Sequence, residues 1–180
     1  VDHVHERRDE ARVAGAAAVS VPYDLGRGSR WIGRGFGKVY EHYFLKSLKR
    51  KTREKARLHP DIADLARLER VCTLLEFDDL VTGPLHGFAS ADDYYARSSS
   101  LHFLRDIRRP TLLLSAIDDP FLPCEVLDEV RAAARDNPAL TPEFVDKGGH
   151  VGFVAGRVPW RPFYYAEWRV VDWLSSALEP

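Results

Sequence analysis

The sequence contains no methionine, only two cysteines, no long apolar run and almost no net charge. Cys72 and Cys124 form no metal-binding or redox motif, which is compatible with a reducing cytosol. A formal net charge of −1 provides no general attraction to nucleic acid or to an anionic membrane. No apolar run approaches the roughly 18–20 residues that cross a bilayer. The charged first eight residues lack the apolar centre of a secretory signal, so we expect a cytoplasmic protein.

The absence of methionine also bears on the extent of the chain. The sequence begins with Val1, which indicates a fragment, a processed form or an alternative start codon. Its 180 residues suffice for one domain with a substantial core. We therefore expect a single domain over residues 1–180, with the composition of an ordinary globular protein.

The order of the predicted elements indicates an α/β fold. An apolar run at 14–24 is typical of a strand buried on both faces, although its alanines would also suit a helix. Further strands are predicted at 111–116 and 143–146. Helices are predicted at 35–57, at 62–75, in a short stretch capped by Ser90, at 123–137 and at 165–178. Strands that alternate with helices favour a parallel sheet.

A long helical stretch separates the first two predicted strands. Glycines between Gly26 and Gly37 indicate a loop, after which apolar residues recur at helical spacing. The stretch at 31–100 is too long for a simple crossover between two parallel strands. We predict that it forms a helical lid over the strand ends.

Two motifs place an acid and a histidine directly after predicted strands. The run at 118–123 (DDPFLP) follows one strand, and the run at 148–153 (GGHVGF) follows the next. Proteins of the α/β class place ligands at the carboxyl ends of their strands. In an acyl-transfer site the histidine takes a proton from the nucleophile and returns it to the leaving group, while a carboxylate fixes the tautomer. The two motifs in this order favour an Asp–His pair over two unrelated turn residues.

The spacing within the first motif distinguishes its two carboxylates. The pattern Asp-x-x-x-Pro, from Asp119 to Pro123, favours Asp119 as the catalytic acid. We interpret Asp118 as a loop cap or a hydrogen-bond partner. In the second motif, Gly148 and the glycine after it allow a sharp turn that presents His150 as the base.

No nucleophile accompanies this pair. The sequence lacks Gly-x-Ser-x-Gly, the elbow that holds a hydrolase serine between a strand and a helix. Ser20 falls inside the first predicted strand, Ser29 lacks the flanking glycines, and the serines at 98–100 lie in the predicted lid. Cys124 begins a helix whose preceding loop already supplies the acid, so an inert thiol is the favoured interpretation.

Three other patterns are weak. The basic stretch at 46–57 is typical of a solvated helix face, because acids dilute it and no stacking aromatics interleave its charges. Residues 3–6 (HVHE) have the types of metal ligands, but no matching partner stands nearby. The run at 33–37 (GRGFG) lacks the preceding strand and the Lys-Ser/Thr ending of a phosphate loop. We expect no nucleic-acid partner, no metal and no cofactor.

Six segments are informative in combination: 18–25 (AVSVPYDL), 35–40 (GFGKVY), 76–79 (EFDD), 92–95 (DDYY), 118–121 (DDPF) and 148–153 (GGHVGF). Through them the chain, from about Arg12 to Leu178, resembles the YheT-like α/β-hydrolases, a group similar to the ABHD1/ABHD3-type and EMB8-type esterases. The resemblance implies the C-terminal part of an α/β-hydrolase fold, with about three parallel strands flanked by helices and a helical lid. It also implies hydrolysis of carboxylic or lipid-like acyl esters, with Asp119 as triad acid and His150 as triad base.

The resemblance implies a missing part as well. Members of the family carry an N-terminal half with early strands, an oxyanion loop and the serine elbow, and this chain begins roughly where the helix after that elbow ends. We therefore expect a serine-type ester hydrolase whose nucleophile lies outside the chain, inactive by itself and with an uncovered edge on its first strand. The alternative is a catalytically inactive acyl- or lipid-binding module. The expected partners are a small ester or lipid-like substrate, the N-terminal half and, peripherally, a membrane.

Overall fold

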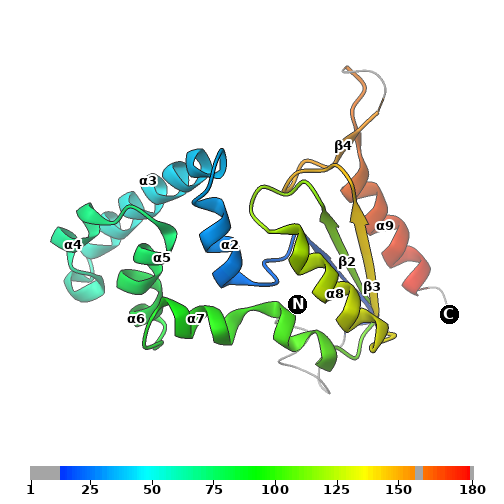
Figure 1. Cartoon of the computed structure of the whole chain (residues 1–180), viewed down its shortest axis with the longest axis horizontal. Coiled ribbons are helices and arrows are strands. Elements are labelled where there is room, and N and C mark those ends of the chain that lie inside the picture. The colour runs from blue at the N-terminus through cyan, green and yellow to red at the C-terminus, as the bar shows by residue number, and fades with distance from the viewer. Residues whose placement is uncertain (1–12, 157–159, 179–180) are drawn as a thin grey trace. The chain divides into compact units, whose positions relative to one another are not determined.

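Three parallel strands form the central sheet of the computed structural model, which describes residues 13–156 and 160–178. Their order in the sheet is β1 (Ala16–Val19), β2 (Thr111–Ala116) and β3 (Leu140–Val145) (Figure 1). Ala16 pairs with Thr111, and Thr111 with Leu140. The carboxyl ends of the strands therefore meet at one edge of the sheet, and the predicted α/β fold with parallel strands is confirmed.

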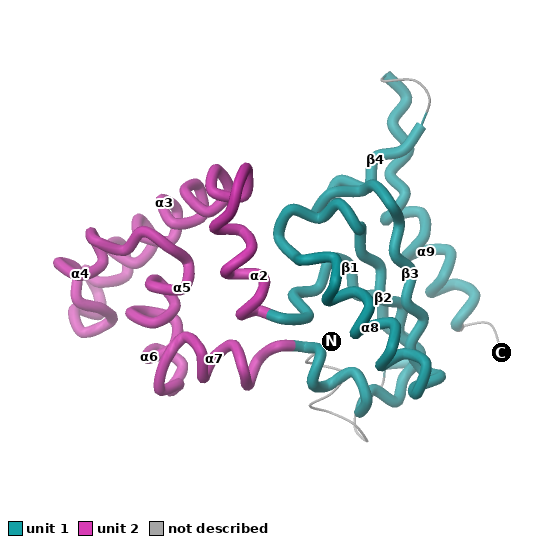
Figure 2. Tube along the Cα trace, viewed as in Figure 1, with its two compact units in different colours: residues 1–24, 100–180 teal, residues 25–99 magenta. Residues whose placement is uncertain are grey.

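The chain divides into two compact units (Figure 2). The sheet unit comprises residues 1–24 and 100–180, and the helical unit comprises residues 25–99. The helical unit accounts for most of the insert expected at 31–100. Its role as a lid stays a prediction.

The middle strand carries the core of the sheet unit, because all six of its residues are buried. Leu113 packs with Val126 and Val130 of helix α8 (Cys124–Arg135). On the alternate positions, Leu112 and Leu114 pack with Phe153 and with helix α9 (Tyr165–Leu178). Helices on both faces are the usual cover of a parallel sheet, and each leucine buried in this way contributes about 1.5–3 kcal/mol relative to an exposed one.

Shorter elements complete the sheet unit. They are η3 (Ser100–Asp106) and an antiparallel pair of two-residue strands, β4 (Val154–Ala155) and β5 (Phe163–Tyr164). Asn137 follows α8 and donates from Nδ2 to the carbonyl oxygens of Leu104 at 2.8 Å and Ile107 at 2.9 Å. The side chain that ends α8 therefore also holds the chain leading into β2.

The helical unit has its own small core. Its elements are α2 (Leu25–Ile32), α3 (Gly37–Ala56), η1 (Pro60–Ile62), α4 (Leu65–Arg70), α5 (Leu74–Phe77), η2 (Asp78–Thr82), α6 (Gly83–Leu85) and α7 (Ala91–Ser98). The core consists of Leu45, Leu68, Val71, Phe77 and Val81. Glu41, a buried carboxylate on α3, accepts a hydrogen bond from the N–H of Leu74 at 3.0 Å and so joins α3 to the start of α5.

Several predicted helices are confirmed with small changes at their ends. The helix expected at 35–57 is α3, the helix at 123–137 is α8, and the helix at 165–178 is α9. Ser90 caps α7 as predicted, because its Oγ accepts from the N–H of Asp93 at 3.1 Å.

Two predictions for the helical unit are wrong. The glycine-rich loop expected at 26–37 is largely the helix α2, where packing against α7 overrides the low helix propensity of glycine. The single helix expected at 62–75 is broken into η1, α4 and α5. Asp64 and Thr73 cap the last two pieces through their side chains, and such local bonds compete with a continuous helix.

The strand ends also differ from the prediction. β1 ends at Val19, so Ser20 lies beyond the strand and not inside it. β3 begins at Leu140, earlier than the predicted start at 143. It includes Pro142, which lacks an N–H but is tolerated because β3 lies at an edge of this sheet.

Candidate active site

The two sequence motifs meet at the carboxyl ends of β2 and β3. The loop after β2 carries Asp119, and the loop after β3 carries His150. Nδ1 of His150 lies 3.0 Å from Oδ2 of Asp119. The side chain of Asp119 is 5% exposed and that of His150 is 36% exposed. The expected contact is therefore present, with a buried acid and a histidine that reaches solvent.

The hydrogen bonds of Asp119 determine how the imidazole is protonated. Its Oδ1 accepts from the N–H of Phe121 at 2.8 Å, which leaves Oδ2 to face His150. A carboxylate is an acceptor, so Nδ1 of His150 carries the proton in this contact. In the neutral ring Nε2 then holds a lone pair, which is the state that a general base requires.

Asp118 has a different partner from its neighbour. Its Oδ1 accepts hydrogen bonds from the backbone N–H groups of Gly148 and Gly149, each at 2.8 Å. The prediction that Asp118 is a hydrogen-bond partner is confirmed. The two adjacent carboxylates thus have different roles: Asp118 accepts hydrogen bonds from the backbone of the histidine loop, and Asp119 contacts the imidazole ring.

The glycines of the histidine loop are required by its geometry. A Cβ on Gly148 would lie 2.8 Å from Cδ1 of Phe153 and 3.0 Å from Cβ of Ala116, too close for either. Gly149 has φ +61°, a left-handed conformation that glycine adopts without strain. The loop can therefore turn sharply while it lies against the end of β2.

A third strand end reaches the same loop. Ser20, directly after β1, has φ +52° and donates from its hydroxyl to the carbonyl oxygen of His150. Its own N–H donates to the carbonyl oxygen of Leu114 at 2.8 Å. The sequence prediction missed this role, because a left-handed serine leaves no pattern in the sequence. Ser20 is thus a positioning residue, held between β2 and the histidine loop.

The ring of Phe121 packs against His150. The two ring centroids lie 4.4 Å apart, with an angle of 53° between their planes. Phe121 follows Asp119 by two residues, so one loop supplies both the carboxylate and the apolar contact. The motif DDPF includes Phe121, but the sequence did not predict that this ring contacts the imidazole.

The serine candidates at 29, 99 and 100 have hydrogen-bond partners other than His150. Ser29 bonds the hydroxyl of Tyr95, and Ser99 donates to the carbonyl oxygen of the same tyrosine. Ser100 lies 3.5 Å from the carbonyl oxygen of Pro22. Cys124 is an exposed thiol at the start of α8. Within residues 13–156 and 160–178, the structure gives Nε2 of His150 no hydroxyl or thiol partner.

Metal ligation and membrane insertion are the two remaining questions for the described residues. They contain no group of three or more His, Cys, Asp or Glu side chains that could hold a metal ion. None of their helices is both long and apolar enough to cross a bilayer. Residues 3–6, which carry metal-ligand types in sequence, lie outside the described residues.

Several known proteins are similar to this chain in sequence. The chain is 37% identical over 169 residues to YheT of Escherichia coli, which is named as an esterase, and the match covers 93% of the chain and 48% of YheT. The chain belongs to the YheT-type family of α/β-hydrolases. It is 29% identical over 177 residues to a monoacylglycerol lipase of Saccharomyces cerevisiae, covering 92% of the chain and 37% of the lipase. It is 26% identical over 121 residues to phospholipase ABHD3 of Mus musculus, covering 67% of the chain and 29% of that protein.

The YheT-type chain spans about half the length of YheT, and less of the other relatives. Its three-stranded parallel sheet flanked by helices is consistent with the C-terminal part of an α/β-hydrolase fold. No family model matches the chain, and no solved structure matches it.

Proposed function

We propose that the chain is the C-terminal portion of a serine-type hydrolase of carboxylic esters, including lipid-like acyl esters. The observation that carries this proposal is the 3.0 Å contact between a buried Asp119 and a partly exposed His150 at the strand ends. Its relatives named as esterases and lipases support the class of reaction. The nucleophilic serine is proposed to come from residues outside these 180, in a Gly-x-Ser-x-Gly elbow. Two exposed free cysteines fit a cytoplasmic location.

The chemistry follows from the protonation of the imidazole. Nε2 of His150 takes the proton of the serine hydroxyl as the serine oxygen forms a bond to the acyl carbon. When the tetrahedral intermediate collapses, the ester C–O bond breaks and the alcohol leaves with that proton. A water molecule then gives a proton to Nε2, attacks the acyl-serine and releases the carboxylic acid, with the proton returned to the serine. Asp119 stays ionised and stabilises the imidazolium in both halves of the cycle.

The helical unit is proposed to serve as a lid that covers the acyl chain of the substrate. This proposal rests on the position of the unit in the sequence, between β1 and β2, and on exposed apolar residues within α3 and directly before it. Phe36 is 72% exposed and Tyr43 is 65% exposed, so both are free to contact an acyl group. A lid from this insert would exclude water from the reacting ester.

The test joins this chain to an N-terminal half of a YheT-type protein that carries the serine elbow. The joined protein is expected to hydrolyse short-chain nitrophenyl esters, and the 180-residue chain alone is expected to be inactive. His150→Gln and Asp119→Asn should each lower kcat by roughly 10³-fold or more. His102→Gln, an exposed histidine of the same sheet unit, should leave kcat unchanged.

The outcomes separate the proposal from its alternative. A folded, joined protein without esterase activity would favour a non-catalytic acyl-binding module. Equal activity in the wild type and in the His150→Gln variant would assign the reaction to other residues and overturn the proposal.

A further inference from the structure

An apolar groove lies within the helical unit, between α3 and the chain from η1 to α6. Its volume is about 470 Å³. Six apolar side chains line it: Leu48, Leu58, Ile62, Phe77, Val81 and Leu85. Leu58 is 80% exposed and Leu85 is 50% exposed, so large apolar side chains remain open to water at this groove. Every residue that lines the groove belongs to the helical unit, and Asp119 and His150 do not.

Cationic side chains stand beside this apolar lining. Lys51 and Lys55 line the groove from α3, and their four-residue spacing places them on one face of that helix. Within the described part of the chain neither ammonium group has a carboxylate partner. Glu54 also lines the groove, but its carboxylate is paired with Arg50 at 3.1 Å. The formal charge of the lining is therefore positive.

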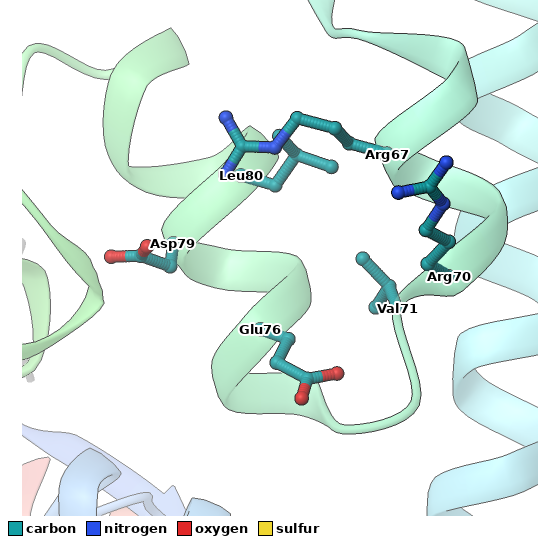
Figure 3. Close-up of a pocket in the computed structure, with 6 residues that line it drawn as sticks. All are labelled: Arg67, Arg70, Val71, Glu76, Asp79 and Leu80. Atoms are coloured by element: carbon teal, nitrogen blue, oxygen red, sulfur yellow. The ribbon is translucent and has the colours of Figure 1, made fainter.

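A second cavity in the same unit provides a comparison. This polar pocket has a volume of about 310 Å³ (Figure 3). Arg67 and Arg70 extend from α4 on one side of it, and Glu76 and Asp79 lie across from them. The carboxylate of Glu76 accepts from two backbone N–H groups, and that of Asp79 accepts from one. The four formal charges cancel and the lining has only two apolar residues, so this pocket favours neither sign of charge.

We propose that the groove binds a single-chain amphiphile with an anionic head, of which a long-chain carboxylate is the chemical class. The chain of such a ligand would cover the exposed leucines, and its carboxylate would lie at Lys51 and Lys55. Burial of apolar surface drives the binding of the chain, and the two ammonium groups select the sign of the head. The inference goes beyond ester hydrolysis, because binding needs neither a nucleophile nor the Asp119–His150 pair.

The test uses the 180-residue protein and decanoate below its micelle concentration. Titration followed by heteronuclear NMR should shift the amide signals of Thr82 and Leu85, with saturation. Lengthening the carboxylate by one methylene should tighten the affinity by about fourfold, the value expected for one buried CH₂. A trimethylammonium amphiphile of the same chain length should bind at least about tenfold more weakly, because its head has the same sign as the lysines.

Two pairs of variants distinguish binding in the groove from non-specific attraction of the carboxylate to the protein surface. Lys51→Glu/Lys55→Glu should weaken decanoate binding at least tenfold, whereas Lys38→Glu/Lys46→Glu, with the same change of charge on the same helix, should alter it less than twofold. Leu85→Ser should weaken it, and Leu65→Ser, outside the groove, should not. All these positions are exposed, so the substitutions should leave the fold intact. Circular dichroism checks that each variant is folded.

Several results would overturn the inference. They are shifts that map outside the groove, equal binding of the cationic amphiphile, and equal loss of affinity in both lysine pairs. None of them would bear on ester hydrolysis by the joined protein, because that assay depends on His150.

Discussion

The carboxylate of Asp118 holds the backbone N–H of Gly149, 31 residues further along the chain, at 2.8 Å. The same oxygen accepts a hydrogen bond from the N–H of Gly148. The next residue, Asp119, contacts the ring of His150. Two adjacent acids therefore fix both the loop that carries the histidine and the orientation of its ring. The loop after β2 therefore positions both the backbone around His150 and its imidazole.

Replacing Asp118 should impair the proposed ester hydrolysis although it leaves the proposed acid, Asp119, and the proposed base, His150, in place. In the joined protein, Asp118→Ala is expected to lower kcat by roughly 10–100-fold with KM changed less than twofold, because a shift of about 1 Å in the imidazole costs that much. Asp118→Asn retains an acceptor oxygen and should lose less. Steady-state kinetics with a nitrophenyl ester measures both parameters.

Asp136→Asn is the matched control for these two variants, since Asp136 is an exposed acid after α8. An Asp118→Ala enzyme with wild-type kcat would show that the contact with Gly148 and Gly149 has no part in placing His150. A rise in KM with constant kcat would assign Asp118 to substrate binding and would also contradict the expectation.

Glycine is expected to be more strictly required at 148 than at 149. Gly148→Ala places a methyl group against Phe153 and Ala116, and such overpacking typically costs about 1–3 kcal/mol. Gly149→Ala meets open space but must adopt φ +61°, which costs roughly 1 kcal/mol. Urea unfolding of the 180-residue chain should rank Gly148→Ala as the less stable variant. The reverse order would mean that Phe153 yields easily to the added methyl group.

The strands and the acid–histidine pair could be predicted from the sequence because their signals are local. In the run 111–116 the consecutive leucines at 112–114 fall on both faces of the strand, which indicates that both faces are buried, and a motif directly after the strand must lie at its carboxyl end. Parallel pairing brings successive strand ends together. The meeting of Asp119 and His150 follows from these two facts.

The helical unit could be predicted only in part, because its breaks depend on single side chains. Residues 62–75 carry apolar positions at helical spacing, yet Asp64 and Thr73 bond backbone N–H groups and start new helices. The helix α2 contains glycines that favour a loop, and its stability comes from contacts with α7 that are distant in sequence. Long-range packing of this kind leaves no periodic signal.

The cap at Thr73 should therefore have a measurable effect on stability. Its Oγ1 accepts from the N–H of Glu76 at 3.2 Å, and Glu76 accepts in return from the N–H of Thr73 at 3.2 Å. Thr73→Ala removes one bond of this capping box and is expected to lower the free energy of unfolding by about 1 kcal/mol. Thr73→Ser keeps the oxygen and should stay within about 0.5 kcal/mol of the wild type. Equal losses in the two variants would show that the methyl group, and not the hydroxyl, matters.

Stability at high pH should depend on Tyr23. This residue is fully buried in the core of the sheet unit, and burial raises its pKa to about 12. In the unfolded chain a tyrosine titrates near 10. Between these values the unfolded chain releases its proton while the folded chain retains it, so stability falls as the pH rises from about 10 to about 12. Denaturant titrations across this range measure the slope.

Tyr23→Phe should flatten that slope, because it removes the group whose pKa differs between the two states. At pH 7 the variant should differ little from the wild type, since phenylalanine fills nearly the same apolar volume. Tyr95, whose pKa is also raised chiefly by burial, would account for the slope that remains. Tyr43→Phe is the matched control, because Tyr43 is 65% exposed. An unchanged slope in Tyr23→Phe would mean that Tyr23 ionises in the folded state as readily as in the unfolded one.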